Sequence, residues 1–294
     1  MDYSRRGFTE LMLSLFFGTR CGNTSSPDRR PVLKHYRADA VILLLGIPIY
    51  KRADVGSGQV SVEADGKGAE VRRTLFFAAG SDPKRAHGLA RLGWMREVRH
   101  GQEPTPTETE YFGVLTSSPE ESLDSARKSV AAPPHGRSLF AAVNGRHTAG
   151  RSRSAVADFD FSSDAAWSDP DLIEKSQSAF APTTVWHETA WHKSPDQPPP
   201  TFLFQLEALL QKKAKCVGTY VYNEQEYVLE LGEPQQGGSS GGLLAIKGAI
   251  RNQRTGHRTA FRVWIEDPPN SVVPVRIEFQ PRSFLRLTFE ALSG

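Results

Sequence analysis

The stretch V-V-P-V-R-I-E-F, residues 272–279, decides the fold class of this chain. Polar Arg276 and Glu278 alternate with apolar residues, which is the period of a strand with one buried and one solvated face. Pro274 falls on the polar face and indicates an edge or the start of a strand. Strands with one wet face are typical of antiparallel sheets. The apolar positions are Val273, Val275, Ile277 and Phe279.

Similar patterns surround this stretch on both sides. Leu285, Leu287 and Phe289 repeat the alternation, and turn signals such as Thr255-Gly256 separate the runs. Near the other end of the chain, Asp65-Gly66 between two strand-like runs predicts a hairpin. The C-terminal third is therefore predicted to contain strands at 221–230, 243–251, 259–266, 272–279 and 284–290.

Helical patterns are fewer than strand patterns. Residues 202–213 follow a proline run and the capping residue Thr201, and their apolar stripe indicates packing on a sheet. Further helices are predicted at 84–92 and, from a capping box, at 119–130. Together these patterns predict a mainly β protein, a curved antiparallel sheet or incomplete barrel packed by one or two helices. We expect a single β-rich domain at 31–294 with an irregular insert at about 131–200.

The first residues predict an export signal. Ser4, Arg5, Arg6 and Phe8 match the core of a twin-arginine signal, and a short apolar run follows at 11–17. We therefore expect residues 1–30 to be a leader, the twin-arginine export machinery to be a partner, and the protein to lie in the periplasm or cell envelope. The alternative is an ordinary amphipathic first helix, which would leave the protein in the cytoplasm.

Two other envelope signals are disfavoured. A lipoprotein signal needs a small residue before the lipidated cysteine, but Arg20 precedes Cys21. A prepilin signal needs its glutamate five residues after the cut, but Glu10 lies at the third place.

The most apolar later run, 41–49, is nine residues long, so no transmembrane span is expected. The formal net charge of +3 gives no electrostatic case for nucleic acid.

No motif predicts catalysis, a metal or a cofactor. Ser239 and Ser240 lie in G-G-S-S-G-G, but a nucleophile elbow needs a preceding strand and a following helix, so a flexible loop is favoured. His187 and His192 in W-H-E-T-A-W-H are five residues apart, a spacing that matches neither a zinc signature nor one face of a strand.

Two flanks of the body resemble an uncharacterised bacterial envelope family, domain of unknown function 3108. The resemblance rests on Y-R-A-D-A-V-I-L-L-L-G-I-P-I with V-G-S-G-Q-V-S-V-E, and on F-R-V-W-I-E-D-P-P-N-S-V-V-P-V-R-I-E-F with F-L-R-L-T-F-E. It covers roughly residues 36–77 and 261–290. It implies a curved antiparallel sheet of the periplasm and supplies no catalytic residues.

The leading functional hypothesis is a non-enzymatic envelope protein that binds or carries a hydrophobic, lipid-like molecule on a concave apolar face. Two alternatives remain: an envelope scaffold or assembly partner, and a periplasmic hydrolase that uses Ser239 or Ser240, or a metal at His187 and His192. The candidate ligand-lining residues are Trp186, Trp191, Trp264 and Phe279.

Overall fold

The computed structural model describes most of the body of the chain. The export-signal prediction, the helix predicted at 119–130 and the pair Ser239 and Ser240 all lie outside the described residues. The described ranges are 31–44, 47–66, 71–85, 91–101, 105–116, 137–237, 242–267, 273–282 and 285–292.

The described residues form one antiparallel sheet of fifteen strands, which confirms the mainly β prediction. Its order is β8-β7-β6-β5-β4-β3-β2-β1-β15-β14-β13-β12-β10-β9, with β11 paired to β12. The edge strands β8 and β9 do not pair with each other, so the barrel stays open. The strands are β1 (Val32–Leu44), β2 (Ile47–Asp65), β3 (Arg72–Ser81), β4 (Leu92–His100), β5 (Glu108–Thr116), β6 (Arg137–Thr148), β7 (Arg151–Ser162), β8 (His187–Ala190), β9 (Cys216–Tyr222), β10 (Gln225–Leu231), β11 (Gln235–Gln236), β12 (Leu243–Asn252), β13 (Arg258–Glu266), β14 (Arg276–Arg282) and β15 (Leu285–Ala291).

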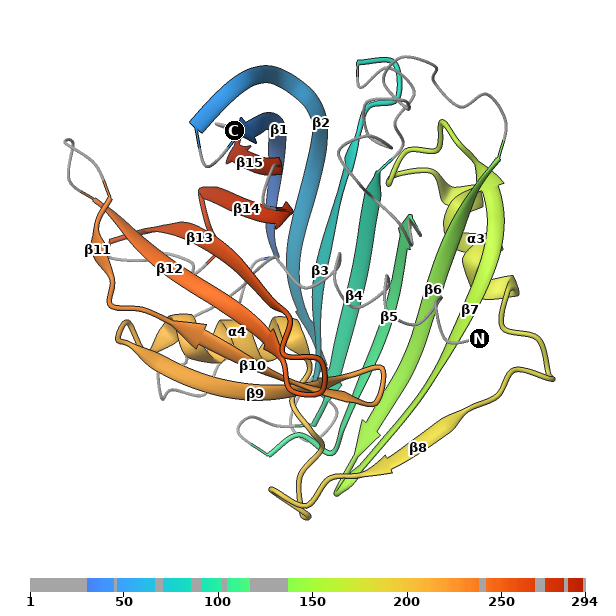
Figure 1. Cartoon of the computed structure of the whole chain (residues 1–294). Coiled ribbons are helices and arrows are strands. Elements are labelled where there is room, and N and C mark those ends of the chain that lie inside the picture. The colour runs from blue at the N-terminus through green and yellow to red at the C-terminus, as the bar shows by residue number, and fades with distance from the viewer. Residues whose placement is uncertain are drawn as a thin grey trace.

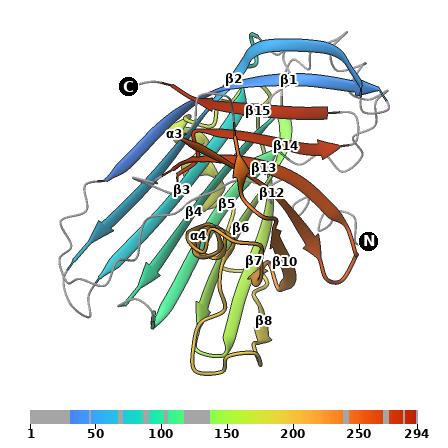
Figure 2. The same cartoon turned by 90° about the vertical axis from the view of Figure 1, so that its left-hand side faces the viewer.

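The sheet curves around helix α4 (Phe202–Gln211), which lies on its inner face (Figures 1 and 2). Seven of the ten residues of α4 are buried, and the core around the helix includes residues from β1 to β6, from β9 and β10, and from β12 to β15. The main core contains residues of α4 together with inward-facing side chains such as Leu75, Tyr220 and Val263. The concave apolar face predicted from the sequence is thus occupied by the protein's own helix.

A second, smaller core lies on the outer face of β4 to β7. Helix α3 (Pro170–Ser178) covers it, and Leu172 of the helix is fully buried there with Phe112, Phe140 and Phe159. Asp169 caps α3 by accepting a hydrogen bond from the Asp171 amide at 3.0 Å. Parts of β4 to β7 are therefore packed on both faces.

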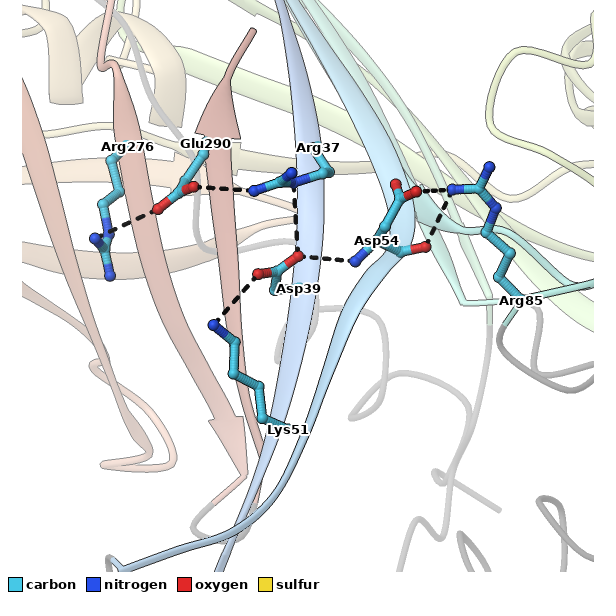
Figure 3. A network of polar contacts seen from close by, with 7 residues as sticks. All are labelled: Arg37, Asp39, Lys51, Asp54, Arg85, Arg276 and Glu290. Atoms are coloured by element: carbon cyan, nitrogen blue, oxygen red, sulfur yellow. Dashed lines mark hydrogen bonds and ion pairs between the residues drawn. The ribbon is translucent and has the colours of Figure 1, made fainter.

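The seam of the sheet is the pairing of β1 with β15, which runs from Tyr36↔Ala291 to Ile42↔Leu285. On its outer face a chain of polar contacts crosses four strands and reaches the segment after β3 (Figure 3). Arg37 lies between Glu290, at 3.4 Å, and Asp39, at 3.8 Å.

A β-bulge interrupts the pairing of β1 with β2 at Asp39. Ala38 pairs with Gly56 and Ala40 with Arg52, so β2 carries extra residues here. One of them, Asp54, has a φ of 56°, and its amide donates to Asp39 Oδ1 at 2.8 Å. The Asp39 carboxylate therefore fixes the bulge conformation (Figure 3).

Several local predictions need correction. The expected irregular insert contains β6, β7, α3 and β8, so regular structure fills most of it. The strand predicted at 221–230 is a hairpin, because Asn223 and Glu224 both have positive φ and form a tight turn. In place of the helix predicted at 84–92, residues 83–85 form a turn and β4 begins at Leu92, while 86–90 lie outside the described residues.

Candidate functional site

A pocket of about 570 Å³ lies on the outer face of β4, β5, β6 and β7, beside the segment that connects α3 to β8. The strand register determines which side chains form the floor of the pocket, because directly paired residues of neighbouring strands point to the same face. Arg96 pairs with Phe112, and Phe112 pairs with Asn144, so all three side chains point outward. Their neighbours Glu97 and Tyr111 point into the core.

Aromatic side chains form one wall of the pocket. The ring centre of Phe180 is 6.2 Å from that of Phe112 and 6.4 Å from that of Trp186. Phe112 is buried in the outer core, whereas Trp186 is 36% exposed. The wall therefore runs from the packed core to the solvent and offers an apolar surface to a ligand.

Three arginines and one glutamate, Glu110, give the pocket lining a positive balance. The guanidinium carbon of Arg153 is 4.8 Å from the centre of the Trp186 ring, a cation–π contact. Arg146 forms an ion pair with Glu108, which neutralises much of its charge. Arg96 is exposed and makes no hydrogen bond or ion pair with the described residues that would neutralise it.

The inner face holds a different polar cluster, at the beginning of α4. Glu97 of β4 is fully buried and accepts hydrogen bonds from the amides of Leu203, at 2.9 Å, and Phe204, at 3.2 Å, and from the Thr201 hydroxyl. Burial raises the pKa of Glu97 to about 7, although these three donors and Arg99 act in the opposite direction. Glu97 is thus a helix cap supplied by a strand.

Two further contacts hold α4 in place. Arg73 of β3 forms an ion pair with the buried Glu207 in the helix. The His147 Nδ1 is 2.8 Å from the carbonyl of Pro199, and burial lowers the pKa of this imidazole to about 4. Glu207 and His147 are buried and Arg73 is only slightly exposed, so this cluster anchors the helix.

The four predicted ligand-lining residues do not meet. Trp186 lines the outer pocket. Trp191 is buried near the β6–β7 turn, where its amide donates to the Gly150 carbonyl at 2.7 Å. Trp264 is buried between Arg262 and Arg276, and Phe279 is buried opposite Phe261.

The two candidate metal ligands have different surroundings. His187 lies on β8 with its Nδ1 3.9 Å from a carboxylate oxygen of Glu224, and His192 is exposed. Nowhere in the described part of the chain do three or more His, Cys, Asp or Glu side chains gather as a metal site would require. Within the same residues, no helix has the length and hydrophobicity needed to cross a membrane.

Sequence reasoning missed Arg96, Arg153 and Phe180 as members of one site. They lie on β4, on β7 and after α3, and only the strand register and the return of the chain over the outer face bring them together. The sequence signal that could have pointed to this pocket was the position of two residues. Arg153 lies in a strand-like segment, and Trp186 directly precedes another strand.

Comparison with known proteins gives a likeness of fold only. No protein-family model matches the sequence, so the resemblance to domain of unknown function 3108 is not confirmed, and no curated protein matches it either. The chain is similar to the crystal structure of a β-barrel-like protein of domain of unknown function DUF1849 from Brucella abortus. The identity is 8%, the alignment covers 89% of this chain and 96% of that one, and the TM-score is 0.41.

Proposed function

We propose that this protein is an exported, non-enzymatic binding protein of the bacterial cell envelope, and that its outer pocket binds a lipid-like molecule with one anionic group. The observation that carries the binding proposal is the pairing of an aromatic wall with Arg96 and Arg153 in one pocket. A volume of about 570 Å³ lies within the range of about 300–1,000 Å³ that is usual for small-molecule sites.

The roles follow from the chemistry of the lining. Arginine guanidinium groups bind carboxylates and phosphates through paired N–H donors. Phe180 and Trp186 offer the apolar surface along which an acyl chain or ring would lie. The twin-arginine pattern at Ser4–Phe8 supports export.

A titration of the purified protein tests the binding proposal. Dodecanoate, kept below its critical micelle concentration, should bind more tightly than dodecanol or inorganic phosphate, because each of those lacks one half of the expected ligand. Arg96→Gln and Arg153→Gln should each weaken dodecanoate binding by about tenfold, the value of one charge-assisted hydrogen bond. Arg254→Gln, the same change in the exposed β12–β13 turn, is the control and should have no effect.

Equal affinity for dodecanoate in the Arg96 and Arg254 variants would overturn the pocket assignment. The export proposal is tested separately, by the mass of the protein recovered from each cell fraction. A chain shortened at its N-terminus in the periplasm supports it, and a full-length chain confined to the cytoplasm contradicts it.

A further inference from the structure

The hairpin formed by β1 and β2 ends in a group of exposed apolar side chains. The exposed fractions are 56% for Leu44, 66% for Ile47, 58% for Ile49 and 53% for Tyr50. We call these four residues the apolar tip. Large apolar side chains are mostly buried in soluble domains, and a group of exposed ones usually marks an interaction surface.

In the part of the chain that the structure describes, the apolar tip lies beyond the paired parts of the neighbouring strands. β15 pairs with β1 only as far as Ile42, and β3 pairs with β2 only from Gly56 onward. Between these limits the two strands of the hairpin pair with each other. Within the described residues, neither neighbouring strand therefore pairs with the tip.

On β2 the apolar tip is exposed on both faces of the hairpin, whereas Leu43 of β1, which pairs with Pro48, is buried. Ile47, Pro48, Ile49 and Tyr50 are consecutive and all exposed, and successive strand residues point to opposite faces. A groove on a protein would cover one face and leave the other in water. A lipid layer would surround both.

The residues after the apolar tip fit the surface of a bilayer. Tyr50 is followed by Lys51 and Arg52, and there is no acidic residue from Ala40 to Ala53. Aromatic residues favour the membrane–water interface, and lysine and arginine favour anionic headgroups. The Lys51 side chain is 67% exposed and lies 3.7 Å from Asp39, at the fixed bulge (Figure 3).

Pairing of this hairpin with a second copy is disfavoured by two residues of β2. Pro48 has no amide hydrogen to donate to a neighbouring strand, and Lys51 places a charge beside the open edge. Both are devices that keep edge strands from joining.

We propose that the β1–β2 hairpin inserts the apolar tip into the surface of an anionic lipid bilayer, with Tyr50 at the interface and Lys51 and Arg52 against the headgroups. This proposal does not depend on the ligand of the outer pocket. The apolar tip lies on the opposite side of β3 from the strands that form the pocket, so a hairpin held at a membrane leaves the pocket a separate site.

Sedimentation with lipid vesicles tests the proposal on the full chain. The protein should bind vesicles of phosphatidylglycerol and phosphatidylcholine in equal parts. The double variant Ile47→Ser/Ile49→Ser should bind them at least about tenfold more weakly, because two apolar side chains no longer enter the lipid. The control Leu33→Ser/Val217→Ser removes two apolar side chains of similar exposure elsewhere and should bind like the unchanged protein. All variants share residues 1–30, so any contribution of that segment cancels.

The basic residues give a second readout. Lys51→Gln/Arg52→Gln should weaken binding to the anionic vesicles and leave binding to pure phosphatidylcholine unchanged, and added salt should remove this difference. Equal vesicle binding by the Ile47/Ile49 variant and the unchanged protein would overturn the proposal. So would a self-association, measured by analytical ultracentrifugation, that needs the apolar tip while vesicle binding is absent.

Discussion

Glu97 of β4 accepts a hydrogen bond from the amide of Leu203 in α4 at 2.9 Å, across 106 residues of sequence. Thr201 occupies the N-cap position of the helix but makes no side-chain cap bond of its own, and its hydroxyl donates to the same carboxyl group. One strand side chain thus accepts the hydrogen bonds of the first amides of α4, the helix that fills the inner face of the sheet.

Removing this carboxyl group should destabilise the whole fold. In Glu97→Ala the buried amides of Leu203 and Phe204 lose their acceptor, and we expect the free energy of unfolding to fall by about 2–4 kcal/mol. Urea denaturation followed by circular dichroism measures the change. Glu230→Ala, which removes an exposed partner of Arg251 and Arg258, should change stability by less than about 1 kcal/mol. Similar losses in the two variants would show that the cap does not contribute as described.

The titration of Glu97 should appear in the pH dependence of stability. Its pKa is about 7 in the folded protein and its ordinary value is 4.5, so the folded state holds the proton more strongly. The contribution is fully present below pH 4.5 and is lost as the pH rises through 7. Between these values the unfolding free energy of the unchanged protein should decrease relative to that of Glu97→Gln. Parallel curves for the two proteins would contradict the raised pKa.

His147 should act in the opposite direction. Burial lowers its pKa from 6.5 to about 4, so the folded state favours the neutral imidazole. Its contribution is present above pH 6.5 and is lost as the pH falls through 4. Relative to His147→Gln, the unchanged protein should therefore lose stability on acidification over this range. Thermal unfolding at a series of pH values tests this, and a difference that stays constant with pH would refute it.

The bulge at the seam should depend on Asp39. Asp39→Ala removes the acceptor of the Asp54 amide, and we expect a loss of about 1–2 kcal/mol and faster hydrogen exchange of that amide. Glu290→Ala, which breaks an exposed contact in the same network, should have a smaller effect. If Asp54 exchanges at the same rate in both variants, Asp39 does not fix the bulge.

Gly145 of β6 should not tolerate a side chain. A Cβ at this position would overlap the Tyr111 ring. The Tyr111 hydroxyl accepts a hydrogen bond from the Asn223 amide at 3.1 Å and so holds the β9–β10 turn to β5. We expect Gly145→Ala to lower the free energy of unfolding by about 1–3 kcal/mol. Gly232→Ala, with its nearest atom at 3.4 Å, is the matched control and should fold like the unchanged protein. Equal melting temperatures for the two variants would exclude the predicted clash.

The fold class was predictable because it depends on local patterns. The alternation in 272–279 and 285–289 predicts strands with one buried face, and the structure has β14, which begins only at Arg276, and β15 there. The helix predicted at 202–213 corresponds to α4, which ends at Gln211. The inner face was predicted as apolar, but nothing local to 202–213 indicates that this helix fills it. Its cap, Glu97, lies on a strand more than a hundred residues away.

The outer pocket was not predictable for a related reason. Arg96 and Phe112 face the same way only because β4 and β5 pair in one register, and a shift by one residue would turn Arg96 inward. Trp186, one of the four candidate ligand-lining residues, lines the outer pocket, whereas Trp191, Trp264 and Phe279 were chosen without knowledge of the register and lie elsewhere.

The β1–β15 seam also sets the order in which the sheet can assemble. The strands from β2 to β8 pair with their neighbours in sequence, but Arg37 and Glu290, which meet across the seam, are 253 residues apart. Such long-range pairing forms slowly, because the chain must close a large loop. During synthesis β1 therefore leaves the ribosome long before β15, and one edge of β1 stays unpaired until β15 has been made. In that interval the growing chain is most open to pairing with other chains.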